Sequence, residues 1–286
     1  MWTNRRLIYA KHAQLPTPFY YKGELKMYYS ARDNENRSYI SFFNLNPDTF
    51  EVIYDHEKPI LSYGSPGRFY DSGVMPSCVV LEDNTLYLFY TGWSRSVTVP
   101  YQQAIGIALS RDGVNFSPLS GPIIGRSIDD PYIVNSANVV YHKDFHPERD
   151  GIGPKYKMIY SSGRCWSGDK PIYGLKCACT SNLWEWTNKT FLVGSNDEIL
   201  SRSTLFNDYL LYSSKKVDTN YRMESYNIKT GERSFSGKMV LMPSKDGWDS
   251  EMICYPYVWE YNRKTYMFYN GNGYGKTGIG VVEWTN

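Results

Sequence analysis

The chain has 286 residues, of which 16% are aromatic and 21% are charged. This composition favours pleated, half-buried strands and excludes a disordered chain, which lacks the apolar area that compensates for ordering. The 31 basic and 29 acidic residues leave a net charge of only +2, so no long-range field attracts nucleic acid or an anionic membrane. We expect neither as a partner, and the sequence leaves the oligomeric state open.

The N-terminus is basic, and the apolar stretch that follows it covers only residues 7–10. A signal-peptide core needs roughly 7–15 apolar residues, and a membrane span needs ~20. No segment of the chain meets either requirement. We therefore expect a cytoplasmic protein.

The cysteines are odd in number and scattered, at positions 78, 165, 177, 179 and 254. Scattered cysteines in strand-like sequence favour free, buried thiols over a disulfide framework.

His142 and His146 flank Asp144, but no cysteine or further histidine lies close to them in sequence, so a zinc site is not expected. The glycines at 271–275 follow a strand without opening a helix, which excludes a phosphate-binding loop. The sequence predicts no metal and no cofactor.

One short pattern recurs along the whole chain: an apolar-aromatic strand that ends in an aromatic pair or near-pair and is followed by a small polar residue. Its copies cover residues 25–30, 86–91, 156–161, 209–213 and 266–270. The second aromatic of each copy, here called the marker residue, stands at position 29, 90, 160, 212 or 269. Because the copies extend over the full length without a change in composition, they predict a single domain, residues 1–286.

Each copy has the same neighbours in chain order. An apolar strand precedes it across a turn such as 82–84, a glycine-containing strand such as 105–110 follows, and a short strand such as 111–116 ends the unit. The turns carry the residues that hairpins use. Four antiparallel strands per repeat, repeated five times, predict an all-β fold that is a five-bladed β-propeller.

The last repeat stops at residues 278–284 without an outer strand, whereas residues 6–10 form a spare strand before the first repeat. If the N-terminal strand pairs at the outer edge of blade five, it closes the ring and covers an edge that would otherwise be exposed. We expect this closure, which makes the two ends of the chain neighbours.

In a propeller, the first strand of each blade lines the central channel, and its start faces one mouth of that channel. The chemistry-bearing residues at these starts are His12 in blade one, Tyr70 and Asp71 in blade two, Asp129 and Asp130 in blade three, Glu198 and Arg202 in blade four, and Trp248, Asp249 and Glu251 in blade five. Trp93 and Trp166 follow marker strands and add aromatic rings. Carboxylates ringed by aromatics suit carbohydrate, because rings stack on sugar C–H surfaces and paired carboxylates catalyse glycosidic cleavage.

The fivefold pattern, the Asp71-Ser72-Gly73 start and the Tyr-Thr-Gly-Trp strand at 90–93 resemble the five-bladed glycoside hydrolase superfamily of families 32, 43, 68 and 130. Residues 248–252 and 269–275 resemble a subgroup found near bacterial surface-polysaccharide genes. Members of the superfamily carry a base or nucleophile aspartate in blade one, an aspartate that tunes the pKa in blade two and an acid glutamate in blade three. Here only Asp71 matches its blade, because His12 stands in blade one and the pair Asp129-Asp130 in blade three.

The catalytic roles can instead be assigned to other blades of the ring. In this assignment Glu251 of blade five is the general acid and Asp71 of blade two is the base or nucleophile, with His12 between them. We expect the two carboxyls to converge on one mouth of the channel, at a separation suited to glycosidic cleavage. The residues expected to bind substrate are Arg202, Glu198, Asp130, Asp249, Trp93, Trp166, Tyr70 and Trp248.

Two functions remain open. The first is a glycoside hydrolase-like enzyme that cleaves or transfers at a glycosidic bond of an oligo- or polysaccharide. The alternative is a non-catalytic glycan-binding or polysaccharide-biosynthesis accessory propeller, which the absent blade-one aspartate favours. Structural roles also compete at individual positions: an aspartate before a strand often caps a turn, Arg202 can neutralise Glu198, and the tryptophans can pack blade against blade.

Overall fold

The structure is a computed structural model that describes residues 1–141 and 153–285. In this part of the chain strands dominate, and the one helical segment is the four-residue α2 (Asn272–Gly275). The all-β prediction is confirmed. His142, Asp144 and His146 lie outside the described residues.

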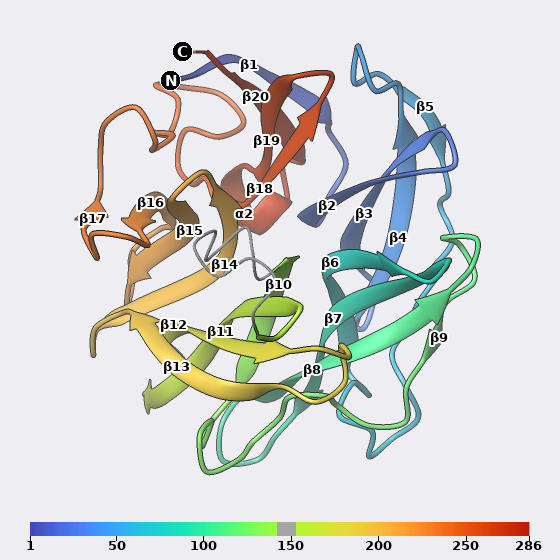
Figure 1. The fold of residues 1–286 in the computed structure, drawn as a ribbon, viewed down its shortest axis with the longest axis vertical. Helices are drawn as coiled ribbons and strands as arrows, with labels where there is room; N and C mark the ends of the chain where they lie inside the picture. The colour runs from blue at the N-terminus through green and yellow to red at the C-terminus, as the bar shows by residue number, and fades with distance from the viewer. Residues whose placement is uncertain (142–152, 286) are drawn as a thin grey trace.

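Antiparallel pairing groups the strands into five sets that follow the order of the chain. The first set is β2 (Gln14–Tyr21), β3 (Glu24–Arg32), β4 (Ser38–Leu45) and β5 (Val52–Asp55), and the second is β6 (Gly73–Glu82), β7 (Thr85–Arg95), β8 (Tyr101–Ser110) and β9 (Ser117–Pro118). The third is β10 (Val134–Tyr141), β11 (Tyr156–Ser167), β12 (Lys170–Thr180) and β13 (Thr187–Val193), and the fourth is β14 (Glu198–Phe206), β15 (Tyr209–Lys216), β16 (Arg222–Asn227) and β17 (Arg233–Ser234). The fifth is β18 (Cys254–Tyr261), β19 (Lys264–Asn270) and β20 (Ile279–Trp284), with β1 (Trp2–Tyr9) at its edge. Figure 1 shows the first strand of each set, here called the inner strand, nearest the middle of the molecule.

The N-terminal strand β1 is the outer strand of the last sheet. It pairs antiparallel with β20, so that Trp2 lies opposite Trp284 and Tyr9 lies opposite Ile279. The backbone N–H of Thr285 donates to the carbonyl of Met1 at 2.9 Å, and Figure 1 shows the two ends of the chain side by side. The predicted pairing of the N-terminal strand with the last sheet is confirmed.

The marker tyrosines are buried, and a buried hydroxyl needs a hydrogen-bond partner. Carboxylates accept from three of them: Tyr160 donates to Asp130 at 3.2 Å, Tyr212 to Glu224 at 3.1 Å and Tyr269 to Asp249 at 2.7 Å. Asp130 and Asp249 stand just before the inner strands β10 and β18. Acids at these positions therefore hold the repeated tyrosines in the core.

A β-bulge interrupts every inner strand close to its start. The register shifts fall at residues 14–17, 76–78, 135–138, 201–203 and 254–257. Positive φ angles mark four of these bulges, at Leu15 (58°), Ser136 (55°), Arg202 (36°) and Tyr255 (58°). A bulge bends its strand and re-aims the side chains at that position, so these residues depart from the regular alternation along the strand.

The small polar residue of the repeat links neighbouring sets at these bulges. Thr91 accepts a hydrogen bond from the N–H of Ser136 at 3.0 Å, and Ser213 accepts one from the N–H of Tyr255 at 2.6 Å. These contacts join the second set to the third and the fourth to the fifth. At these two positions the repeated serine or threonine thus has a structural function that the sequence pattern alone did not reveal.

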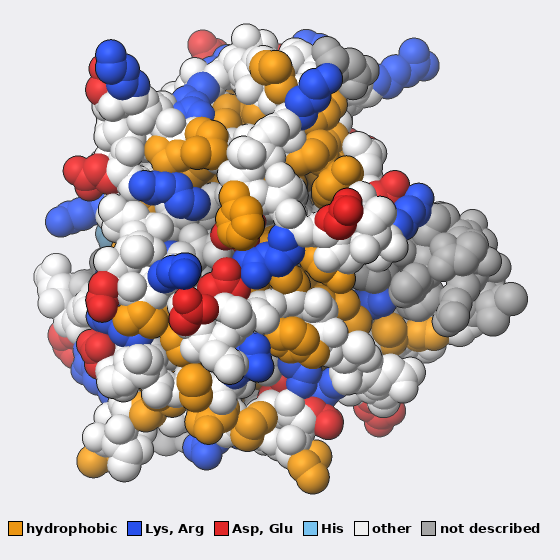
Figure 2. Space-filling model, turned by 90° about the vertical axis from the view of Figure 1, so that its left-hand side faces the viewer, with side chains coloured by type: hydrophobic (Ala, Val, Ile, Leu, Met, Phe, Trp, Pro, Cys, Tyr) orange, Lys and Arg blue, Asp and Glu red, His pale blue; other side chains and the backbone are white. Residues whose placement is uncertain are grey.

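The outer surface is mixed in character. Figure 2 shows basic and acidic side chains next to one another on one side of the molecule, with apolar groups between them. All five cysteines are free, as expected. None of the helical structure in residues 1–141 and 153–285 has the length and apolar character needed to cross a membrane.

Candidate functional site

A cavity of about 660 Å³ lies where the inner strands begin. Every set contributes to its wall, through Gln14 and Leu15 of β2, Met75 of β6, Asn135 and Ser136 of β10, Ile199 and Ser201 of β14, and Tyr255 of β18. Most of these residues lie at the bulges described above, except Met75 and Ile199. The volume falls within the range of roughly 300–1,000 Å³ that is typical of small-molecule sites.

Aromatic rings form much of the cavity wall. The lining includes Trp93, Tyr101, Tyr173, Tyr221, Tyr255 and Tyr274. Tyr221 meets Tyr274 edge to face, with 6.0 Å between ring centroids, and lies at the same distance from Tyr255. Burial raises the pKa of Tyr173, Tyr221 and Tyr255 well above the usual value, so their hydroxyls stay neutral and can donate or accept hydrogen bonds.

The charged groups of the lining are mainly basic. They are Arg32 of β3, Lys170 of β12, Lys215 of β15, Lys276 after α2 and the carboxylate of Asp169. Asp169 pairs with its neighbour Lys170 at 3.4 Å. No group of three His, Cys, Asp or Glu suited to a metal ion occurs within the described ranges. The donor set therefore suits an anionic or hydroxyl-rich ligand.

His12 brings an unsatisfied nitrogen to this wall. Its Nε2 atom is buried, and no described residue forms a hydrogen bond with it. Burial lowers the pKa of His12, and the positive charges of Arg32 and Lys276 lower it further. The lowered pKa favours the neutral form of His12, and its buried Nε2 atom keeps an unused hydrogen-bonding capacity beside the cavity.

Of the predicted site residues, His12 and Trp93 line the cavity, whereas Asp71 and Glu251 do not. The carboxylate of Asp71 accepts hydrogen bonds from the N–H of Gly67 at 3.0 Å and the hydroxyl of Ser72 at 2.9 Å, in the turn before β6. Glu251 is exposed. Their assignment as base and acid stays a prediction.

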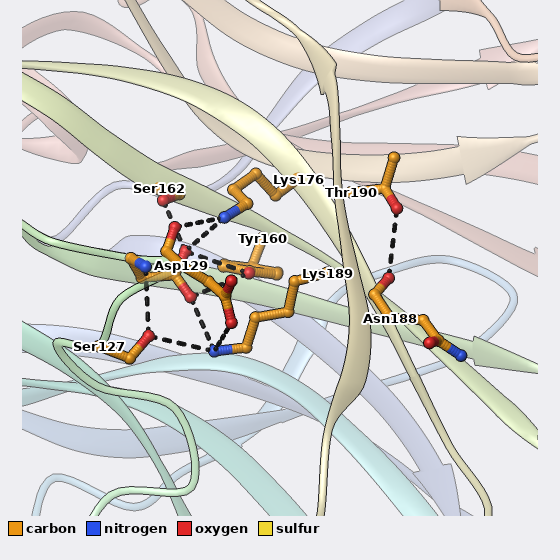
Figure 3. A network of polar contacts seen from close by, with 9 residues as sticks. Ser127, Asp129, Tyr160, Ser162, Lys176, Asn188, Lys189 and Thr190 are labelled. Atoms are coloured by element: carbon orange, nitrogen blue, oxygen red, sulfur yellow. Dashed lines mark hydrogen bonds and ion pairs between the residues drawn. The ribbon is translucent and has the colours of Figure 1, made fainter.

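Asp130 is not part of the cavity lining. The side chains that contact it, Tyr160, Ser162, Lys176 and Lys189, gather in the polar network drawn in Figure 3. Its carboxylate accepts from Ser162 at 2.7 Å, from Lys189 at 2.9 Å, from Lys176 at 3.1 Å and from Tyr160 at 3.2 Å. Burial alone would raise the pKa of Asp130, but the hydrogen bonds from these lysines and the serine bring it below the usual 3.8. Its partners thus come from the protein itself, which favours a structural role over substrate binding.

Asp249 and Glu198 are also paired within the protein. Asp249 is fully buried, and Arg5 of β1 donates to it at 2.9 Å. Glu198 accepts two hydrogen bonds from Arg233, at 2.9 and 3.0 Å. Buried carboxylates need such partners, because an unpaired charge in the interior costs several kcal/mol. Neither residue belongs to the cavity lining.

Arg202 is 2% exposed and binds backbone carbonyls between the inner strands. It donates to the carbonyl of Pro16 at 3.0 Å and to that of Pro76 at 3.1 Å. The interpretation that Arg202 neutralises Glu198 is wrong, since Arg233 pairs with that carboxylate instead. Arg202 ties the inner strand of the fourth set to those of the first and second.

The remaining predicted aromatics pack behind the wall. Tyr70 lies edge to face on Tyr90 at 5.9 Å, and Trp248 packs on Tyr269 at 5.2 Å. Trp166 meets Tyr101, which does line the cavity, edge to face at 5.4 Å. These rings support the core and the wall from outside the lining.

Sequence reasoning missed most of the cavity wall because, apart from Trp93 and Trp166, it considered only the starts of the inner strands. The second strand of each set ends at the same mouth. Arg32, Trp93 and Lys215 each stand three residues after a marker residue, at 29, 90 and 212, and all three line the cavity. The repeat therefore contained a usable signal at this position.

No protein-family profile matches the chain. Two curated relatives come from Mycobacterium tuberculosis: Uncharacterized protein MT1551 of strain CDC 1551 and Uncharacterized protein Rv1502 of strain H37Rv. Each is 29% identical over 289 residues, which cover 96% of this chain and 93% of the relative.

Solved structures show a much clearer similarity in fold. A protein whose structure is described only as a glycoside hydrolase aligns over 100% of this chain and 90% of its own, with a TM-score of 0.72 and 14% identity. A thermostable family-43 glycoside hydrolase aligns over 99% and 91%, with a TM-score of 0.68 and 12% identity. The β-1,2-mannobiose phosphorylase from Listeria innocua aligns over 98% and 90%, with a TM-score of 0.64 and 11% identity. The chain therefore shares its fold with these glycoside hydrolases and with this phosphorylase.

Proposed function

We propose that the protein is a single-domain, five-bladed β-propeller that binds an oligo- or polysaccharide in the cavity at the starts of its inner strands. Each strand set is one blade, and β1 closes the ring in the fifth. The pairing of β1 with β20 and the hydrogen bonds between sets support this architecture.

The observation that carries the binding function is the make-up of the cavity wall. Aromatic rings stand beside neutral amide and hydroxyl groups, namely those of Gln14, Gln103, Asn135, Ser136 and Ser201. Sugars present C–H faces to rings and hydroxyls to amides, so one wall can recognise both features. The volume of about 660 Å³ accommodates a short oligosaccharide.

The wall supports binding better than cleavage. Glycosidic cleavage usually requires two carboxyl groups, about 5–5.5 Å apart in retaining enzymes and about 6.5–9.5 Å apart in inverting ones. Asp169 is the one carboxylate in the described lining, and it is paired with Lys170. We therefore place glycan binding first.

Two exposed tyrosines provide a matched test. Tyr274 is 37% exposed and lines the cavity, whereas Tyr20 is 43% exposed and lies outside the lining. We expect Tyr274→Ala to weaken binding to glycans selected on an array by about 5-fold or more, since ring contacts contribute about 1 kcal/mol. Tyr20→Ala should bind as wild type does. Equal affinity of both variants, measured by calorimetry, would contradict a glycan site in this cavity.

Glycosidic cleavage is the second candidate, favoured by the unpartnered Nε2 atom of His12 in the cavity. In this function Glu251 is the general acid, Asp71 the base or nucleophile, and His12 assists proton transfer. The test is release of reducing ends from the glycans that bind. Loss of turnover in Asp71→Asn and Glu251→Gln, with binding retained, would support the assignment. Binding without turnover in wild type would exclude it.

We also propose a cytoplasmic location. Five free thiols, four of them buried, are typical of a reducing compartment. Fractionation of the native host, with a periplasmic marker as reference, tests this proposal directly.

A further inference from the structure

We propose that the cavity recognises an acidic glycan, and that Arg32, Lys276 and His12 together bind its carboxylate or phosphate group. This inference rests on the proposed function, because it specifies the class of carbohydrate that the same cavity accepts. It assigns a ligand-binding role to two basic residues that the sequence did not single out.

The first argument is charge. Arg32, Lys170, Lys215 and Lys276 line the cavity against one carboxylate, that of Asp169, which Lys170 already pairs. Among the described residues no carboxylate lies within 4.0 Å of the side-chain nitrogens of Arg32, Lys215 or Lys276. Three cations thus face one space without a protein counter-ion. An anionic ligand would supply the missing charge.

The second argument is the partial burial of Arg32. Its guanidinium lies over the ring of Trp93, 5.6 Å from the centroid, and donates to the carbonyl of Asn36 at 2.8 Å. Burial lowers the pKa of Arg32, with no carboxylate to offset it. The half-buried guanidinium keeps unused N–H donors in a planar fork, which matches carboxylate and phosphate oxygens.

The third argument is the way in which the backbone holds Lys276 beside His12. The N–H of Ala13 donates to the carbonyl of Gly275 at 3.0 Å, and the amide of Asn270 donates to the carbonyl of Ala13 at 2.6 Å. Gly275 has a φ of 88°, and a Cβ atom there would lie 2.2 Å from the Ala13 carbonyl oxygen. The segment 12–13 and the loop 272–276 are therefore fixed against each other. The anion subsite, formed by Arg32, Lys276 and His12, is preorganised to that extent.

The ring of His12 completes the subsite. Its Nε2 atom is buried without a partner, and Arg32 and Lys276 are the charged groups that act on it. Burial raises the pKa of Tyr173, Tyr221 and Tyr255 in the wall, and Asp169 is paired with Lys170. An anion between Arg32 and Lys276 would accept a hydrogen bond from a protonated His12, so anion binding and proton uptake by His12 are coupled.

The confined position of this charge favours a small acidic glycan over nucleic acid. The whole chain has a net charge of only +2, and the side shown in Figure 2 alternates in sign. Nucleic-acid binding relies on extended basic surfaces that contact many phosphates. Here four basic groups and one carboxylate line a single cavity, whose aromatic wall adds the stacking surface that a sugar ring needs.

The primary test is an NMR titration of the His12 ring with sodium sulfate at constant ionic strength. Sulfate keeps its charge between pH 5 and 8, so it reports the anion subsite without titrating itself. We expect a saturable rise in the pKa of His12, absent in Arg32→Gln and in Lys276→Gln. Lys264→Gln is the matched control, because Lys264 pairs with Glu283 outside the cavity lining. An unchanged pKa, or an equal rise in all variants, would overturn the inference.

A second measurement uses carbohydrates: digalacturonate, glucose 1-phosphate and neutral cellobiose. We expect Arg32→Gln to weaken binding of the acidic ligand by about 10-fold or more, as loss of a charge-assisted hydrogen bond predicts. The two acidic ligands distinguish carboxylate from phosphate recognition. Binding of neutral sugar that Tyr274→Ala weakens and Arg32→Gln leaves unchanged would retain the proposed function and refute the acidic class. Far-ultraviolet circular dichroism of each variant excludes misfolding as the cause.

Discussion

The side chain of Asn270 accepts a hydrogen bond from the backbone N–H of Leu15 at 2.7 Å, although 255 positions separate the two residues. The same amide donates to the carbonyl of Ala13 at 2.6 Å and to that of Gly278 at 3.0 Å. Asn270 is the small polar residue of the fifth repeat, and Leu15 is the bulge of the first inner strand. One buried amide thus joins the last strand set to the first and supports the subsite at His12.

Replacing Asn270 by Ala should lower the free energy of unfolding by about 2–4 kcal/mol, because the change leaves the buried N–H of Leu15 and the carbonyl of Ala13 without this partner. Urea unfolding at pH 7 measures the effect. Ser161 is the equivalent residue of the third set, and its buried hydroxyl has no partner among the described residues. Ser161→Ala should therefore change stability by less than about 1 kcal/mol. Equal losses in the two variants would contradict the bridging role of Asn270.

Arg5 of β1 provides a second stability test, since it donates to the fully buried Asp249 at 2.9 Å. Arg5→Ala leaves that carboxylate with Tyr269 alone, and we expect a loss of about 2–4 kcal/mol. The exposed Lys11, which pairs with Asp55, serves as control and should cost less than about 1 kcal/mol when replaced by Ala.

Deleting residues 1–10 should cost more than Arg5→Ala alone. The deletion removes the whole pairing of β1 with β20 as well as the contacts of Trp2, which is 8% exposed. It also leaves β20 as an exposed edge. Thermal melting measures the loss, and a melting temperature within a degree or two of wild type would refute closure of the ring by β1.

The network at Asp130 predicts a dependence of stability on pH. The folded-state pKa of this carboxyl lies below its usual 3.8, so its contribution is complete above that value and is lost as the pH falls through 3.8 toward the folded-state pKa. Asp130→Asn should be less stable than wild type at pH 7, and the gap should narrow toward pH 3. Asp129→Asn is the control, because its side chain is 56% exposed and lies 4.0 Å from Lys189. A gap that stays constant between pH 7 and pH 3 would contradict this assignment.

Thiol reactivity gives a prediction that does not depend on function. Burial raises the pKa of the Cys78 thiol to about 12, and Cys165 is the one cysteine that is not buried. In the native protein, Cys165 should react with a thiol reagent first, because the thiolate is the reactive form and needs access. After denaturation without reductant, mass spectrometry should count five alkylated cysteines. A count of three would indicate a disulfide.

The strand pattern was predictable because it depends on local chemistry. Alternating apolar residues, hairpin turns and the marker aromatics at 29, 90, 160, 212 and 269 act within a few residues of one another. The same pattern predicted an opening at the starts of the inner strands. The bulges lie at these starts, and several of their residues line the cavity.

The identity of the site residues was less predictable, because it depends on partners distant in sequence. Asp249 lies beside Arg5 only after the two ends of the chain meet, and Glu198 is paired by Arg233 from another strand. An acid before a strand has the same sequence signature whether it faces a ligand or a buried arginine. The cavity is also lined by residues that follow a marker residue, such as Arg32 and Lys215.

Because β1 pairs with β20, the two ends of the chain could be joined and new ends opened in another loop. A short linker from Thr285 to Met1 would convert the two strands into an ordinary hairpin, since their backbones already exchange a 2.9 Å hydrogen bond. New ends could then be introduced at the exposed Gly121, between the second and third sets, where no set is divided. Such a circular permutant would keep every strand partner and fold with its cavity intact, while folding would begin from a different set.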